Sequence, residues 1–208
     1  MLRPPLTRHA GPIALVVGVF LLIQQVAMAS FLDRSAIEST MANPLFVPLA
    51  AAYFVAFCGL LVVLVTAYGR EADEAGAFGV LAFLVALVGT MFLAGDLWFE
   101  AFAVPWLGDV APASLHVPGG TLVIGAFIGY VLFAVGWVLF GLASIRAHVF
   151  PLPISIAIVL AGIIGFQAAL PPFAIPLAVA ICSLGIWMIR TRPATTSAPV
   201  LARVGWSR

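Results

Sequence analysis

Long apolar runs separated by short polar breaks dominate this chain. Six of these runs have, or nearly have, the roughly 20 apolar residues that a helix needs to cross a bilayer. Because they are apolar on all sides, and not short and alternating like barrel strands, they predict helices. The predicted fold is an all-α transmembrane helical bundle of about six spanning helices, which occupy Gly11–Phe31, Pro44–Tyr68, Ala77–Phe102, Gly120–Ile145, Pro151–Leu170 and Pro172–Ile189.

Proline and glycine mark the ends of these runs. Proline is tolerated in the first turn of a helix and disfavoured in its interior. Almost no loop separates the last two runs at Pro171-Pro172, so they should form a tight antiparallel pair. The bundle accounts for residues 1–190 as one domain. Residues 191–208, rich in Thr, Ser, Ala, Pro and Arg, predict a disordered cytoplasmic tail.

The arginines predict an orientation in the membrane. In a six-helix topology only Arg34 falls on one side of the bilayer. The other eight basic residues fall on the opposite side: Arg3, Arg8, Arg70, Arg146, Arg190, Arg192, Arg203 and Arg208. Basic loops stay in the cytoplasm, so both termini are expected there, with the chain a multi-pass protein of a bacterial plasma membrane.

A competing interpretation concerns the first helix. Arg3 and Arg8, the apolar stretch that follows them, and Ala27-Met28-Ala29 before Ser30 together resemble a secretory signal with its cleavage site. The apolar run is long for a signal core and continues past that site, which favours a retained helix. Cleavage would leave five helices and an external N-terminus.

Composition agrees with a membrane protein and limits its partners. The chain is 64% hydrophobic and 8% charged, with a mean hydropathy of +1.21, whereas soluble domains carry about 25% charged residues. A net charge of +1 without a basic run gives no reason to expect nucleic acid. The expected partners are the lipid bilayer and a membrane protein or a second copy of the chain.

No cofactor, metal or catalytic set is predicted. A bis-histidine haem needs two facing histidines within the membrane, and His9, His116 and His148 all lie outside the apolar runs. Cys58 and Cys182 are isolated within apolar runs and form neither a disulfide framework nor a zinc motif. Glycine-rich phosphate loops and hydrolase or metalloprotease signatures do not occur, so an enzyme is not favoured.

One polar site is a candidate for ligand or ion binding. Asp96 and Glu100 lie four residues apart near the end of the third run, where they would share a helix face. Gln24, Gln25, Gln167 and His116 are predicted at a similar outer level of the bundle. Polar side chains in membrane helices usually face the bundle interior or a water-filled cavity. An outward-facing polar pocket is one interpretation. The other is a plain helix end with interhelical hydrogen bonds.

Parts of the sequence resemble a known kind of chain. The stretches Asp96–Pro105, Gly136–Ala143 with Arg146 and Pro151, and Leu170-Pro171-Pro172 resemble uncharacterised six-helix membrane proteins of actinobacterial-type, GC-rich bacteria. The resemblance covers roughly residues 11–189 and implies a small multi-pass protein. It carries no known activity, so no site residue is transferred.

Two classes of function follow from these observations. Apolar packing explains most residues, which favours a structural, accessory or regulatory membrane protein. The alternative is a small ion- or proton-coupled transporter that uses an outward-facing pocket around Asp96 and Glu100.

Overall fold

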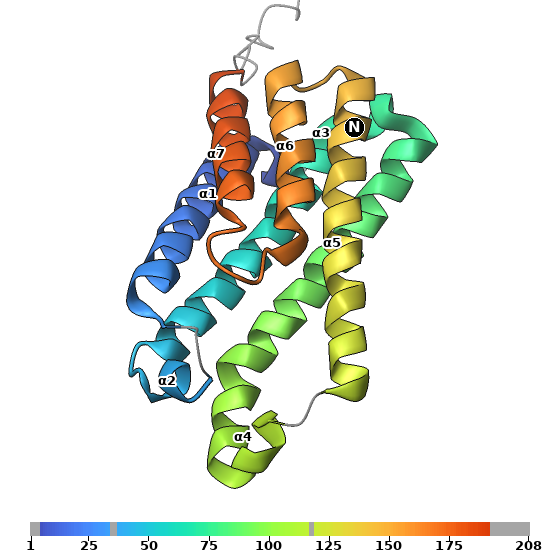
Figure 1. Ribbon diagram of the computed structural model, residues 1–208. Coiled ribbons are helices and arrows are strands. Elements are labelled where there is room, and N and C mark those ends of the chain that lie inside the picture. The colour runs from blue at the N-terminus through green and yellow to red at the C-terminus, as the bar shows by residue number, and fades with distance from the viewer. Residues whose placement is uncertain (1–4, 34–36, 117–118, 192–208) are drawn as a thin grey trace, which may run out of the picture.

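The protein is an elongated bundle of helices (Figure 1). A computed structural model describes residues 5–33, 37–116 and 119–191, without the side chains of residues 5–8, 37–38 and 116. Every regular element in these ranges is helical, which confirms the all-α prediction. The elements are α1 (Pro5–Phe31), α2 (Ile37–Ala42), α3 (Phe46–Trp98), the π-helix η1 (Phe99–Ala103), α4 (Val104–Val110), the 3-10 helix η2 (Pro112–His116), α5 (Gly120–Ala147), α6 (Leu152–Ile164), the 3-10 helix η3 (Gly165–Gln167) and α7 (Ile175–Arg190).

Some predictions fall on other parts of the chain. The expected tail beyond Thr191 lies outside the described residues, as do Arg3, Arg34, Arg192, Arg203 and Arg208. The Ala27-Met28-Ala29 motif lies within α1, where Met28 is fully buried.

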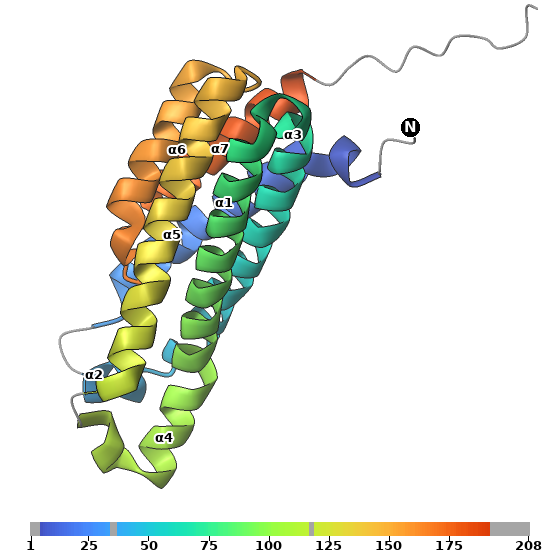
Figure 2. The ribbon, with the colours of Figure 1, turned by 90° about the vertical axis from the view of Figure 1, so that its right-hand side faces the viewer.

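The element α3 consists of two antiparallel arms joined at Gly76. Gly76 has φ 60° and ψ −157°, a backbone conformation that essentially only glycine adopts. The Tyr68 and Phe83 rings stack with their centroids 4.3 Å apart, whereas one straight helix would separate these residues by about 22 Å. Figures 1 and 2 show the chain folding back at this end of the bundle. Residues 46–75 form the first arm and residues 77–98 the second.

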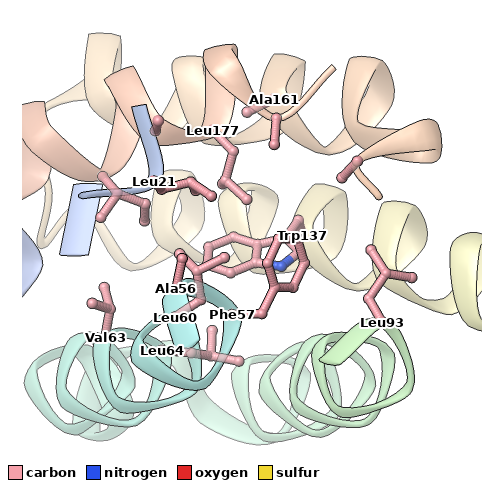
Figure 3. Close-up of a cluster of buried hydrophobic side chains, with 14 of the residues drawn as sticks. Leu21, Ala56, Phe57, Leu60, Val63, Leu64, Leu93, Trp137, Ala161 and Leu177 are labelled. Atoms are coloured by element: carbon pink, nitrogen blue, oxygen red, sulfur yellow. The ribbon is translucent and has the colours of Figure 1, made fainter. Parts of the chain in front are cut away.

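Both arms bury one stripe of side chains. Buried positions recur every three or four residues, the spacing that places them on one face of a helix. In the first arm they include Phe46, Ala50, Tyr53, Phe57, Leu60, Leu64, Ala67 and Glu71, and in the second Gly79, Ala82, Ala86, Gly89, Leu93 and Leu97. Figure 3 shows the centre of this core, where Phe57, Leu60 and Leu64 lie close to Trp137 of α5.

The second arm of α3 and α5 approach each other closely. A Cβ added to Gly136 would lie 2.6 Å from the backbone nitrogen of Ala86, closer than real Cβ atoms come. Beside this contact the buried Trp137 indole N–H donates to the Thr90 hydroxyl oxygen at 3.1 Å. Glycine therefore permits the approach, and the hydrogen bond satisfies the polar atom of the largest core side chain.

Three stretches are long and apolar enough to cross a membrane. They are His9–Phe31, Phe46–Val110, which contains the Gly76 reversal, and Gly120–Ala147. The prediction of six helices of spanning length is wrong for α6 and α7, which have 13 and 16 residues and are about 20 and 24 Å long. Between them the chain runs through η3 and turns, because Pro171-Pro172 lacks two of the backbone donors that a helix needs.

Candidate functional site

Asp96 lies in a groove between the second arm of α3 and the start of α5. The groove has a volume of about 650 Å³, and its polar lining comes from Asp96 and Thr121. The other lining side chains are apolar, or glycines such as Gly95 and Gly125. Asp96 is half-buried, and its Oδ2 accepts a hydrogen bond of 3.0 Å from the Tyr130 hydroxyl of α5. The hydrogen bond from Tyr130 thus orients the Asp96 carboxylate in a groove whose other walls are mostly apolar.

The groove follows α5 from its first turn. Its α5 wall extends from Thr121 to Gly129, a length of about 12 Å. Gly95 and Gly125 face open space, since a Cβ added to either would meet no atom within 4 Å. These two glycines widen the groove, and its shape suits an elongated apolar group better than a bare ion.

Glu100 belongs to η1 and is not among the residues that line this groove. A regular helix would have placed Asp96 and Glu100 on one face. In the π-helix each turn contains an additional residue, which rotates the following side chains about the helix axis. The backbone N–H of Val104 accordingly bonds to Phe99 O, five residues earlier. The structure thus separates the roles of the two carboxylates.

Gln24 and Gln25 are buried and serve other contacts. Gln24 Nε2 donates to the backbone oxygen of Leu49, near the start of α3. Gln25 Oε1 accepts a hydrogen bond of 3.1 Å from the backbone N–H of Ala174, in the connection between α6 and α7. Neither glutamine lines the Asp96 groove. Both contacts are of the interhelical kind that the sequence offered as the alternative to a pocket.

The connection between α6 and α7 is partly buried, and its backbone bonds to side chains from other helices. Ala168 and Ala174 are fully buried. The Tyr53 hydroxyl of the first arm of α3 donates to Ala168 O, while Gln25 accepts from Ala174. Irregular backbone at membrane depth is tolerated when it is buried in protein and its polar groups are satisfied. Tyr53 and Gln25 satisfy two of these backbone groups, the carbonyl of Ala168 and the N–H of Ala174.

Gln167 and His116 do not line the groove either. Gln167 ends η3 and is exposed, and His116 ends η2 with its side chain outside the described residues. The ring of the neighbouring Phe166, in η3, nevertheless lies beside Tyr130, with 6.4 Å between the two ring centroids. The Tyr130 hydroxyl is the hydrogen-bond donor to Asp96, so η3 lies near the level of this carboxylate.

Glu71 is a polar residue whose burial the sequence analysis did not anticipate. The predicted helices Pro44–Tyr68 and Ala77–Phe102 leave Glu71 in the loop between them, but it lies in the first arm of α3 and is fully buried. Neither carboxylate oxygen has a hydrogen-bond partner among the described residues. One signal in the sequence was available. Glu71 follows Leu60, Leu64 and Ala67 at helical spacing and so continues the buried stripe.

Burial changes the protonation of Glu71, which lies beyond the apolar run that ends at Tyr68. The loss of hydration raises the pKa of its carboxyl from 4.5 to about 7, and the nearby Ser144 hydroxyl offsets part of this rise. The Ser144 hydroxyl donates its single proton to Phe140 O at 3.0 Å, so it stabilises a Glu71 carboxylate by turning away from that carbonyl. The carboxyl is therefore poised to gain or lose a proton near neutral pH.

No cluster of three or more His, Cys, Asp or Glu side chains suited to a metal ion occurs within the described ranges. Cys58 and Cys182 are free thiols, each half-buried. The chemistry available in this part of the chain is therefore that of single carboxyl groups in apolar surroundings.

Comparison with known proteins brings no match, since no family model, characterised protein or solved structure is significantly similar to this chain. The function must therefore be inferred from the site alone.

Proposed function

We propose that the chain is an integral protein of a bacterial plasma membrane. The support comes from its apolar outer surface, which is clearest on α5. Large hydrophobic side chains are exposed along this helix from Leu122 to Leu142, a span of about 30 Å, which equals the thickness of the bilayer's hydrocarbon core. Exposed apolar surface over this length would be unfavourable in water and is favourable in lipid.

The proposed topology has four full crossings and one short helical pair. The crossings are α1, the apolar parts of the two arms of α3 (residues 46–68 and 77–98), and α5. The pair α6–α7 enters from the side where α5 ends, and its connection stays within the bilayer. Arg146 and Arg190 lie in the last turns of α5 and α7, and Arg70 lies shortly before the Gly76 reversal. These ends of the three helices lie together at the top of Figure 1. The positive-inside rule places this end, and with it both termini, in the cytoplasm. This preserves the orientation expected for six crossings.

The proposed function is binding of an amphipathic cation in the outward-facing groove, in the class of small carriers. The observation that carries it is the carboxylate of Asp96, oriented by Tyr130, in a groove of about 650 Å³ whose walls are otherwise almost entirely apolar. An apolar body would fill the walls, and its positive charge would replace water around Asp96. A charge in such surroundings is stabilised mainly by an opposite charge. The groove thus supports the transporter class over a purely accessory one.

Binding of tetraphenylphosphonium to the purified protein in maltoside micelles tests this proposal. We expect saturable binding that Asp96→Asn weakens about 10- to 100-fold, the value of one charge-assisted contact. Glu100→Gln is the matched control, because Glu100 lies one turn away and does not line the groove. Triphenylphosphine oxide, which is neutral and has three phenyl groups where the cation has four, should bind weakly and with equal affinity to the wild type and to Asp96→Asn.

Equal affinity of the wild type and Asp96→Asn would overturn the assignment. A loss in Glu100→Gln that matches the loss in Asp96→Asn would do the same. Uptake of the cation into proteoliposomes then separates a carrier from a protein that only binds. Transport predicts uptake that disappears in Asp96→Asn.

A second candidate is an accessory protein that packs against a partner's membrane helix. Gly125 and Gly129 have the four-residue spacing of helix-packing motifs, and Gly125 is open to an approaching helix. Purification in mild detergent distinguishes the two candidates. An accessory role predicts a co-purifying membrane protein that is lost in Gly125→Leu and retained in Asp96→Asn. The cation-binding role predicts ligand loss in both variants and no stable partner.

A further inference from the structure

The Gly76 end of the bundle contains buried polar atoms that the proposed function does not use. Glu71 is fully buried and both of its carboxylate oxygens lack a partner among the described residues. Ser155, at the start of α6, is also fully buried, and its hydroxyl oxygen lacks a partner there too. Ser144 of α5 lies beside Glu71. Polar atoms this deeply buried are normally hydrogen-bonded, so their occurrence at one end of the bundle requires an explanation.

The three side chains come from three packed elements. Glu71 belongs to the first arm of α3 and Ser144 to the facing helix α5. The α5–α6 contact reaches the same level, because a Cβ added to Gly141, one turn before Ser144, would lie 3.0 Å from Ser155 O. Figure 2 shows α6 and α5 running side by side up to the end where α3 reverses.

Among the side chains that the structure describes, Glu71 is the only charged one that is fully buried. On its own element Asp73 and Glu74 are exposed and Arg70 is half-buried, and on α5 and its C-terminal cap Arg146 and His148 are exposed. The groups that act on the Glu71 carboxyl are its burial and the hydroxyl of Ser144. A carboxylate without a partner is strongly destabilised in such a place, whereas a neutral carboxylic acid is tolerated and brings a donor of its own.

We propose that Glu71 is an internal proton-binding site at the cytoplasmic end of the bundle, and that release of its proton loosens the packing of the Gly76 reversal against α5. In the packed state the carboxyl is protonated. When it transfers the proton to water, the resulting carboxylate must reach water. The first arm can supply that only by moving Glu71 out of the contact with α5 or by admitting water into it. This inference does not depend on the cation-binding groove.

The pH dependence of thermal unfolding in maltoside micelles tests the site. The folded protein holds the proton more tightly than the unfolded chain, so its stability is greatest below the ordinary pKa of 4.5 and decreases up to a pH of about 7. Across this window the folding equilibrium should weaken by on the order of a hundredfold. Glu71→Gln, which is always neutral, should remove this decrease. Asp73→Asn, an exposed acid two residues away, should leave it unchanged.

Two further measurements do not depend on how well the Glu71→Gln variant folds. Ser144→Ala should move the transition to higher pH, because the Ser144 hydroxyl lowers the pKa of Glu71. Infrared spectra of the wild type should show the stretching band of a protonated carboxyl group that disappears as the pH is raised through the same window.

A wild-type stability that does not change with pH across this window overturns the proposal. Loss of the dependence in Asp73→Asn, or absence of the protonated-carboxyl band at the acidic end, overturns it as well. If sodium chloride raises the unfolding temperature at alkaline pH more than choline chloride does, and Glu71→Gln abolishes the difference, the site holds a metal cation and the proton assignment is wrong.

Discussion

At the scale of single residues, Tyr53 and Gln25 stabilise a stretch of backbone that no helix satisfies. They lie on α3 and α1, yet both bond to the connection between α6 and α7. The Tyr53 hydroxyl and the Gln25 side-chain oxygen are thus used for packing. Asp96 differs because its carboxylate is only half-buried and borders a groove. Burial and the identity of the partner, rather than residue type, separate these two roles.

Tyr53→Phe should destabilise the folded protein by about 1–3 kcal/mol, because it leaves the buried carbonyl of Ala168 without its donor. The matched control is Tyr68→Phe, since Tyr68 is half-buried and contributes mainly by stacking on Phe83, a contact that phenylalanine keeps. Unfolding in mixed micelles measures both changes. Equal losses in the two variants would show that the Tyr53 hydroxyl has no specific role.

At the scale of elements, two glycines determine how α3 folds and packs. Gly76 permits the reversal between the arms, and Gly136 permits the close approach of the second arm to α5. The two act differently. The first depends on backbone conformation, and the second depends on the missing side chain.

Gly76→Ala should destabilise the protein by roughly 1–3 kcal/mol, the usual strain of a non-glycine residue in this backbone region. The site has open space around it, so crowding does not contribute. Gly69→Ala, also in open space, lies in regular helix and should be neutral or slightly stabilising. Thermal unfolding of both variants checks this, and a Gly76→Ala variant as stable as the wild type would contradict the assignment of strain.

Gly136→Ala should cost about 1–3 kcal/mol, because the new methyl group pushes α5 away from the backbone of Ala86. Gly125→Ala on the same helix meets no atom within 4 Å and should be neutral or stabilising by up to about 1 kcal/mol. The difference in unfolding free energy between these two variants is the measured quantity. If they behave alike, helix propensity rather than close packing accounts for the result.

At the scale of the whole molecule, charged residues gather at one end of the bundle, and the connection between α6 and α7 lies far from either end (Figure 1). The reversal of α3 and the ends of α5 and α7 lie together in Figures 1 and 2. The connection between α6 and α7 stays at the level of Asp96 and Tyr130. The proposed topology therefore makes a specific prediction about which positions meet water.

Single cysteines introduced into a variant without Cys58 and Cys182 test this topology. Ser114→Cys should react with a membrane-impermeant maleimide on intact cells, and Glu74→Cys only after permeabilisation. Leu170 lies in the connection between α6 and α7, with its side chain exposed on the surface of the bundle. Leu170→Cys should react slowly in both conditions because lipid surrounds it. Labelling of Leu170→Cys as fast as that of Ser114→Cys would show that α6 and α7 cross the full bilayer.

Much of the architecture could be predicted from the pattern of apolar residues. The predicted runs Pro44–Tyr68, Ala77–Phe102 and Gly120–Ile145 coincide largely with the two arms of α3 and with α5. The lengths of the last two helices could not be predicted this way, since the residues between Gly165 and Ala174 are as apolar as a helix interior. Only Pro171-Pro172 indicated a break in the helix. The length of the irregular connection depended on its contacts with Gln25 of α1 and Tyr53 of α3.

The candidate site was predicted in part. Asp96 lies near the end of its arm and borders a groove, and its role in ligand binding stays a prediction. The proposed cluster with the glutamines depended on rotation about each helix, and the π-helix at Phe99–Ala103 changes that rotation for Glu100. Glu71 was missed because charge was taken as a sign of exposure, although its position in the stripe indicated the opposite.

The sequence by itself determined that the chain forms long apolar helices and where most of them begin and end. These properties follow from local hydrophobicity and helical periodicity. Only the tertiary structure decided which polar side chains meet. It placed Asp96 beside Tyr130, Gln25 on the backbone of Ala174 and Glu71 beside Ser144. Each of these contacts joins residues that are 34 or more positions apart, and their distances depend on how the helices pack against one another.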